Sequence, residues 1–202
     1  MSRTFKSTVD VRSHALACLT SSKFLSKRGL ASQLPIFIAA FDPLETAELK
    51  VLPNWLVSQA LLSGIRVFHV DVFTELVKSL SDQQILDSVV EQERAKVLSR
   101  RQVTSAIHAA ADLSSRLPAR IASGIFIEKP QAILISGFEA SYPYFRVTEL
   151  VGMLEEMQLE VPVVILFPGS FDDTLKSPIL KLFGEIDENH NYRALDLFHY
   201  EA

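Results

Sequence analysis

The sequence predicts an α/β fold: a mostly parallel, Rossmann-like or P-loop-like sheet of about five strands with helices on both faces. Three observations carry this prediction. Apolar runs with the length of a single buried strand recur along the chain, helical stretches separate them, and turn signals such as Asp42-Pro43 and Pro168-Gly169 follow two of the runs. Continuous apolar runs are typical of parallel strands, which are buried on both faces.

The N-terminal part alternates helix and strand. An opening helix is expected at residues 9–27, and the apolar run at 35–41 predicts the first, central strand. A helical stretch at 44–63 follows. Pro53 is expected to begin a second helix there, because a proline in the first turn loses no hydrogen bond. The run at 65–71 predicts the second strand.

Helices are expected to fill residues 73–123, as an insertion between strands two and three, because the segment is longer than one crossover helix requires. A capping-box pattern at residues 81–84 predicts the start of one of these helices. The run is expected to end near Pro118 or Gly124. The length of the chain favours a single domain over residues 1–202.

The C-terminal part repeats the alternation. The ranges are a third strand at 131–138, a helix at 145–158, a fourth strand at 161–167, a short helix at 175–183 and a last strand at 192–198. The Pro168-Gly169 pair is expected to end the fourth strand in a tight loop.

Composition narrows the class of protein. The 202 residues are 48% hydrophobic and carry a formal net charge of −4, which excludes a global positive field for nucleic acid. Mean hydropathy is +0.20, but no apolar run has the length of a membrane span. The single cysteine, Cys18, excludes an internal disulfide. The N-terminus shows no signal-peptide pattern, so we expect a cytoplasmic protein without membrane contact.

The phosphate-binding motifs that such folds often carry are missing. The seven glycines are too far apart for a G-x-G-x-x-G motif, and no Gly-Lys pair exists for a P-loop. A P-loop needs glycines so that backbone N–H groups approach the phosphates, and a lysine to pair with them. We therefore expect no nucleotide or other cofactor.

Carboxylates follow several predicted strands. Asp42, Asp71 and Glu139 each follow one, as do Asp172 and Asp173. Because parallel strands end at one edge of the sheet, the first three predict, as an alternative function, a metal-dependent phosphodiesterase or nuclease. The favoured interpretation is that they cap helices and turns, where these residue types are common.

Two further patterns are candidates for nucleophilic chemistry. His14 and Cys18 are four residues apart and would share a helix face, but free cysteines are usually buried and inert. Ser170 follows Gly169 without a nucleophile elbow around it, so this pair is interpreted as a turn. We assign no catalytic, cofactor-binding or metal-binding residue, and we expect no enzyme activity.

The densest basic patch of the sequence predicts one kind of DNA contact at most, in which basic side chains of a single helix bind DNA phosphates. Its members are Arg94, Lys96, Arg100 and Arg101, and Glu91 and Glu93 lie beside it. Mixed charges of this kind more often form a solvated helix face. Direct contact with DNA therefore stays open.

Three stretches identify a family. They are residues 134–143, residues 163–171 with their Phe-Pro-Gly ending, and residues 182–185 followed by Asn-Tyr-Arg-Ala at 191–194. Over essentially its whole length the chain resembles BrxB, a small core protein of bacterial BREX phage-defence systems. The resemblance implies a non-catalytic assembly component that binds a PglZ-type protein and supports a DNA methyltransferase complex, with the methyltransferase and a large ATPase as further partners.

Aromatic residues gather just after the third predicted strand. They are Phe138, Tyr142, Tyr144 and Phe145. Exposed aromatic side chains often anchor protein partners, so these four are the candidate partner-binding residues. The alternative is that they pack against the helix that follows.

Overall fold

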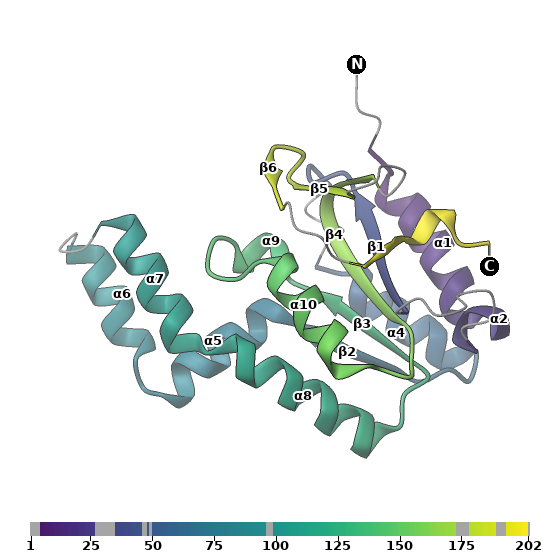
Figure 1. The fold of residues 1–202 in the computed structure, drawn as a ribbon, viewed down its shortest axis with the longest axis horizontal. Coiled ribbons are helices and arrows are strands. Elements are labelled where there is room, and N and C mark those ends of the chain that lie inside the picture. Colours follow the sequence, from purple (N-terminus) through teal and green to yellow (C-terminus); the bar gives the residue numbers. More distant parts are fainter. Residues whose placement is uncertain are drawn as a thin grey trace.

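The structure is a computed structural model that describes residues 5–26, 35–45, 48, 50–95, 99–172, 178–188 and 193–201. Within these residues a seven-stranded sheet forms the centre, and five of its strands are parallel in the order β2-β3-β4-β1-β7 (Figure 1). The five are β1 (Ile36–Phe41), β2 (Val67–Asp71), β3 (Ala132–Ser136), β4 (Val163–Asp172) and β7 (Leu195–Asp196). The predicted fold class is confirmed.

Each face of the sheet has its own apolar core. Phe37, Ala39 and Phe41 of β1 pack with α1 (Thr8–Thr20) and α4 (Leu52–Leu62). Ile36 and Ile38, which alternate with them, pack on the opposite face. Both sets are buried because side chains along a strand alternate between the two faces and helices cover both.

The predicted opening helix is divided at Ser21. Helix α1 starts at a capping box in which Ser7 and Asp10 bond each other's backbone, and α2 (Ser22–Leu25) follows the break. Pro53 stands in the first turn of α4, as predicted.

Among the described residues between β2 and β3 there are four helices, which confirms the predicted helical insertion of the fold class. They are α5 (Val72–Asp82), α6 (Leu86–Ala95), α7 (Arg100–Ala111) and α8 (Leu113–Glu128). In Figure 1, α6 and the far part of α7 extend away from the sheet as a hairpin, whereas α8 runs along the sheet.

Two predicted boundaries in this region are wrong. Ser81 lies inside α5, where the buried residues Leu76 and Leu80 keep the helix in register past the capping-box pattern. Helix α8 runs through Pro118 and Gly124, because Leu117 and Ile121 pack into the core on either side of the proline. The gain from burying these side chains outweighs the hydrogen bond that Pro118 cannot donate.

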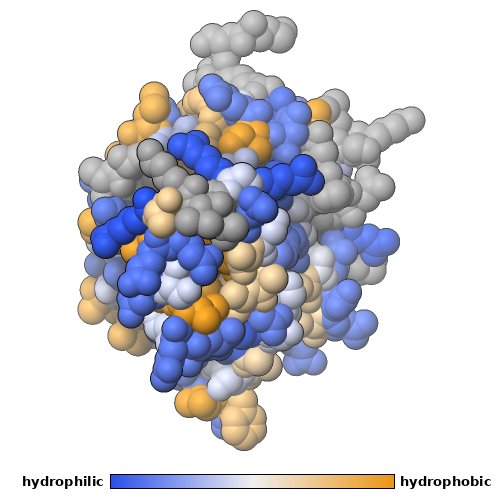
Figure 2. Space-filling view, turned by 90° about the vertical axis from the view of Figure 1, so that its left-hand side faces the viewer, coloured by the Kyte–Doolittle hydropathy of each residue, from blue (hydrophilic) through white to orange (hydrophobic). Residues whose placement is uncertain are grey.

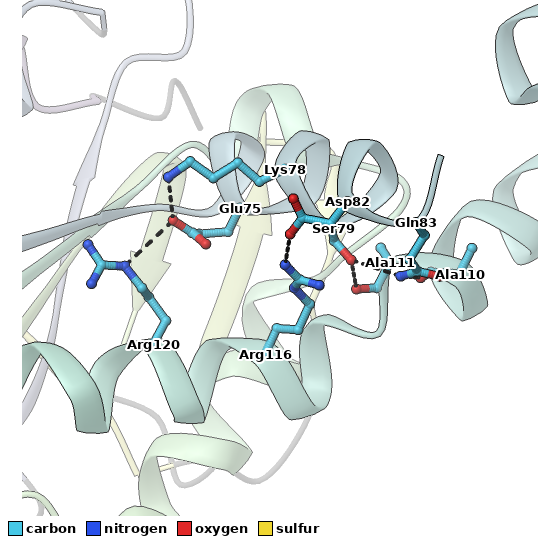
Figure 3. Close-up of polar contacts among 9 residues, drawn as sticks. All are labelled: Glu75, Lys78, Ser79, Asp82, Gln83, Ala110, Ala111, Arg116 and Arg120. Atoms are coloured by element: carbon cyan, nitrogen blue, oxygen red, sulfur yellow. Dashed lines mark hydrogen bonds and ion pairs between the residues drawn. The ribbon is translucent and has the colours of Figure 1, made fainter. Parts of the chain in front are cut away.

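Helix α5 is fastened to α7 and α8 by four side chains (Figure 3). The buried Ser79 hydroxyl donates to Ala111 O at 2.5 Å, and Gln83 Nε2 donates to Ala110 O at 2.5 Å. Asp82 pairs with Arg116 of α8, and Glu75 lies 3.7 Å from Arg120 Nε. These bonds fix the layer of helices that covers one face of the sheet.

The C-terminal part differs most from the prediction. After α9 (Phe138–Ser141) and α10 (Val147–Met157), strand β4 does not stop at Pro168-Gly169. It continues to Asp172 and pairs antiparallel with β5 (Ile179–Leu182), which pairs with β6 (Ile186–Asp187). The helix expected at 175–183 is therefore wrong over Ile179–Leu182, and residues 173–177 lie outside the described residues.

Gly169 permits this continuation, because a Cβ at that position would lie 2.0 Å from Lys181 O on the neighbouring strand. The last predicted strand is reduced to β7, followed by the 3₁₀ turn η1 (Leu197–His199). Along the described part of the chain, no helix is long and apolar enough to cross a membrane.

Candidate functional site

The carboxyl ends of β2 and β3 border a pocket of about 560 Å³. Ligands of doubly wound sheets bind at this edge, so we treat the pocket as the candidate site. Its polar lining residues are Lys50, Asn54, His69, Asp71, Thr74 and Glu139. The pocket arises because β2 and β3 are neighbours in register, with Asp71 opposite Ser136.

Asp71 is held by two hydrogen bonds of the fold. The Thr74 N–H donates to Asp71 Oδ1 at 2.7 Å, which caps the N-terminus of α5. The Ser136 hydroxyl donates to Asp71 Oδ2 at 3.3 Å. Both carboxylate oxygens therefore take part in local structure, as expected for a helix cap.

The hydrogen bond between His69 and Ser136 has the opposite direction to that of a nucleophile–base pair. His69 Nε2 lies 2.8 Å from Ser136 Oγ. Since the single Ser136 proton goes to Asp71, the Ser136 oxygen accepts from the Nε2–H of a neutral His69. Burial lowers the pKa of His69, although the charge of Asp71 opposes this effect. An activated serine would instead donate to the histidine, so this arrangement orients Ser136 without activating it.

Glu139 enters the same pocket from the first turn of α9. Burial raises its pKa, and the neighbouring negative charge of Asp71 adds to the rise. Gly137 lies between the two elements, where a Cβ would contact Asp71 Oδ2 at 2.9 Å. A side chain at Gly137 would therefore disturb the Asp71 cap.

Asp42 lies apart from the other two predicted carboxylates. It follows β1, which is separated from β2 by β3 and β4, roughly 14 Å across the sheet at the usual strand spacing. Its Oδ1 accepts from Leu44 N at 2.9 Å, an Asx-type turn. The prediction that Asp42, Asp71 and Glu139 share one metal site is wrong. Among the residues that the structure describes, no three His, Cys, Asp or Glu side chains are placed to hold a metal ion.

A second, smaller pocket of about 280 Å³ lies at the ends of β1, β4 and β7. Gly169, Ser170 and Asp172 of β4 line it, together with Lys6 and Asp196. Ser170 faces Lys181 in a regular antiparallel pair, so it is part of a strand and not of the predicted turn. Asp173 lies outside the described residues.

The four candidate partner-binding aromatics divide into two pairs. Phe138 and Phe145 are each only 2% exposed and belong to the core, so their rings face the protein interior. Tyr142 and Tyr144 are partly exposed and pack against the same core. Only these two tyrosines can offer aromatic surface to a partner, and that role stays a prediction.

Cys18 and His14 do not form a catalytic pair. Cys18 is fully buried, and burial raises the pKa of its thiol to about 12, which disfavours the nucleophilic thiolate. His14 bonds Leu197 O through Nε2 at 2.8 Å and stacks on Phe198. Both residues serve the packing of α1.

The basic patch is not on one helix. Arg94 lies in the last turn of α6, and Arg100 and Arg101 begin α7 after a capping box at Ser99. These three are exposed at the far end of the hairpin, and Lys96 lies outside the described residues. Sequence reasoning missed the division into two helices because residues 91–101 carry no glycine or proline.

Other residues of the candidate pocket were missed as well. Lys50 and Asn54 enter the pocket lining from the loop before α4 and from α4 itself, far from β2 in the sequence. The bond between His69 and Ser136 depends on the pairing of β2 with β3. Neither feature leaves a local signal in the sequence.

The fold and the pocket define a mostly parallel α/β protein with helices on both faces of its sheet and a candidate pocket at the carboxyl ends of β2 and β3. The chain belongs to the BrxB family: the family model described as BREX protein BrxB matches residues 68–197. A BREX protein BrxB from Bacillus cereus (strain H3081.97) is 24% identical over 183 residues, which cover 89% of this chain and 91% of the relative. No solved structure matches the chain. The resemblance expected from residues 134–143, 163–171, 182–185 and 191–194 is confirmed.

Proposed function

We propose that this chain is a non-catalytic assembly component of a BREX phage-defence complex in the cytoplasm. In this proposal it binds a PglZ-type protein and supports the complex that contains the DNA methyltransferase. Membership of the BrxB family supports its place in BREX. The adaptor role and the partner are the parts that the proposal adds.

The observation that carries the non-catalytic role is the use of polar groups at the candidate pocket. Asp71 caps α5 and accepts from Ser136, and Ser136 in turn fixes His69. In this proposal these hydrogen bonds serve the cap of α5 and the junction of β2 with β3, and the Ser136 hydroxyl donates to Asp71 and not to a base that would activate it. The edge also lacks the glycine-rich turn that brings backbone N–H groups to a phosphate.

The sequence of α9 and the following turn supports a binding role. Tyr142 and Tyr144 keep part of their surface open, and Arg146 lies over the Tyr142 ring at 5.9 Å. Tyrosine and arginine are enriched where protein interfaces gain most of their binding energy. This is the surface that we propose for the PglZ-type partner.

The test is co-purification from the complete BREX operon with a tag on this chain. We expect the PglZ-type protein in near-stoichiometric amount, and its recovery to fall in a Tyr142→Ala/Tyr144→Ala variant. Leu44→Ala, a change at a side chain that is 86% exposed beyond β1, is the control. Recovery of the chain without a PglZ-type protein would contradict the proposal.

A further inference from the structure

The end of the α6–α7 hairpin carries three arginines whose side chains have no partner in the described chain. Arg94 lies in the last turn of α6, and Arg100 and Arg101 occupy the first two positions of α7. All three are exposed, and among the residues that the structure describes none of them has an ion pair, a side-chain hydrogen bond or an aromatic contact. By contrast, Arg116 and Arg120 of α8 each reach a carboxylate of α5. The three guanidinium groups are therefore open to a ligand from outside the chain.

The segment that contains these arginines is basic within an acidic chain. Residues 94–111 include four arginine and lysine residues and no aspartate or glutamate, whereas the whole chain has a net charge of −4. Glu91 and Glu93 precede the segment, and they leave the end of the hairpin with a net positive charge. This end projects away from the sheet in Figure 1, and Figure 2, which views the molecule from that side, shows strongly hydrophilic surface around it. A positive projection on a negative body is typical of contact with a polyanion.

Two of the arginines lie where they weaken their own helix. The first turn of α7 contains no acidic residue, so Arg100 and Arg101 meet the positive end of the helix dipole without compensation. The Ser99 hydroxyl accepts from the N–H of Gln102, but no described residue accepts from the backbone N–H groups of Arg100 and Arg101. An anion from outside the chain would relieve the repulsion and also accept these two hydrogen bonds.

The outward side of α7 fits a phosphate backbone better than a protein surface. Arg101, Ser105 and Ala109 are exposed at a spacing of four residues, and arginine and serine are common ligands of nucleic-acid phosphates. No described residue of α7 is a large apolar side chain that is exposed, although such side chains form the centre of protein interfaces. Residues 94–111 contain no Phe, Tyr or Trp that could stack on unpaired bases. A double helix is therefore favoured over a single strand.

We propose that the end of the α6–α7 hairpin binds the phosphate backbone of a nucleic-acid double helix without regard to base sequence. Arg94, Arg100 and Arg101 are the phosphate ligands, and the first N–H groups of α7 add to them. The contact goes beyond the proposed function. It ends before His108, which bonds Tyr144 O and lies 3.8 Å from a carboxylate oxygen of Glu149. Because only about three phosphates are neutralised, binding is weak and depends on salt.

Fluorescence anisotropy of the full chain with short labelled duplexes of mixed sequence tests this contact. We expect a dissociation constant on the order of micromolar at about 50 mM salt, and an affinity that falls about 40-fold by about 200 mM salt. An Arg94→Gln/Arg100→Gln/Arg101→Gln variant should bind at least about tenfold more weakly at the lower salt concentration and lose most of the salt dependence. Duplexes of DNA and of RNA are compared, and the one that is bound more tightly identifies the ligand. Absence of binding at the lower salt concentration, or binding that the variant leaves unchanged, would overturn the proposal.

A Lys23→Gln/Lys78→Gln/Lys129→Gln variant is the matched control, because it removes the same net charge from exposed positions outside the hairpin. Its affinity for the duplex should stay close to that of the parent. If it binds as weakly as the arginine variant, binding depends on net charge alone and the proposal fails. The arginine variant should unfold at no lower a temperature than the parent, because glutamine removes the repulsion at the start of α7. Weaker binding by this variant then does not reflect misfolding.

Two further measurements separate this contact from contacts with proteins. Co-purification of the PglZ-type protein should persist in the arginine variant, so failure of one proposal leaves the other intact. Polyglutamate should compete with the labelled duplex far less well than an unlabelled duplex at equal charge concentration. Equal competition would assign the end of the hairpin to an acidic protein surface and overturn the proposal.

Discussion

Gly124 of α8 lies directly against the ring of Phe68 in β2: a Cβ at position 124 would be 2.2 Å from Phe68 Cζ. Phe68 is 2% exposed, and Arg120 lies over its ring. The ring therefore has little room to move. This contact sets how closely α8 approaches the edge of the sheet.

Gly124→Ala should lower the free energy of unfolding by about 1–2 kcal/mol, because overpacking against Phe68 exceeds the gain in helix propensity. Gly152→Ala in α10 is the control, since no described atom lies within 4 Å of a Cβ there. Gly152→Ala should raise the free energy of unfolding by up to about 1 kcal/mol. Urea denaturation measures both, and equal stabilisation by the two changes would contradict the close contact.

Asp71→Asn combined with Glu139→Gln should leave phage protection intact, because the proposed function needs no carboxylate chemistry at the pocket. Asparagine keeps the cap on α5 by accepting from Thr74 N. Asp71→Ala should instead lower stability by about 1 kcal/mol through loss of the cap. Plaque counts and thermal unfolding separate the two effects. A folded double variant without protection would support an enzymatic role.

Glu188 carries a pH dependence of stability. Its side chain is 1% exposed, and among the described residues Oε1 has no hydrogen-bond partner, although Arg146 Nη1 lies 3.8 Å away. Burial raises its pKa above the ordinary 4.5, against the opposing charge of Arg146. Its contribution to stability is therefore complete below pH 4.5 and is lost as the pH rises through the folded-state pKa.

Glu188→Gln should consequently raise stability at pH 7 by about 1 kcal/mol and flatten the decline of stability with increasing pH. Chemical denaturation at pH 5 and pH 7 is the measurement, with the exposed Glu160→Gln as control. A variant that is less stable than the parent at pH 7 would show that the Arg146 ion pair outweighs desolvation.

Gly169→Ala should weaken the pairing of β4 with β5, because the new Cβ would overlap Lys181 O of the neighbouring backbone. We expect the free energy of unfolding to fall by about 3 kcal/mol, which is at the upper end of the range for an overpacked site. Hydrogen exchange should rise in Ile179–Leu182. Ser170→Ala, one residue further along the strand, is the control. It should leave both the free energy of unfolding and the hydrogen exchange of Ile179–Leu182 unchanged.

Ser79→Ala should destabilise the protein more than Arg116→Ala does. The first change leaves the buried carbonyl of Ala111 without its Ser79 donor, which is expected to lower stability by about 1–3 kcal/mol. The second removes an ion pair whose side chains are 36% and 62% exposed, worth at most about 1 kcal/mol. Thermal melts rank the two, and the opposite order would mean that ion pairs hold α5 in place.

The sequence was sufficient to predict the strands that consist of continuous apolar runs. β1, β3 and the first part of β4 are continuous apolar segments, and the prediction placed each of them within a few residues. It failed where tertiary contacts override local signals. Pro168-Gly169 looks like a turn, yet pairing with β5 keeps the chain extended. Pro118 looks like a helix end, yet Leu117 and Ile121 hold α8 together.

The candidate site was predictable only in part. Asp71 and Glu139 are predictable as neighbours because each follows a strand, and β2 and β3 are indeed adjacent. Asp42 carried the same signal, but strand order decides which ends meet, and no local pattern encodes that order. The burial of Phe138 and Phe145 likewise depends on how α9 folds back onto the core.

The position of β1 in the sheet determines when this strand can fold during synthesis of the chain. Both neighbours of β1, the strands β4 and β7, lie far downstream in the chain. A nascent polypeptide that has just completed β3 still holds Ile36–Phe41 without a pairing strand. The newly made N-terminal half thus exposes an unpaired apolar segment until β4 has been translated. Fragments that stop earlier should aggregate or require chaperones.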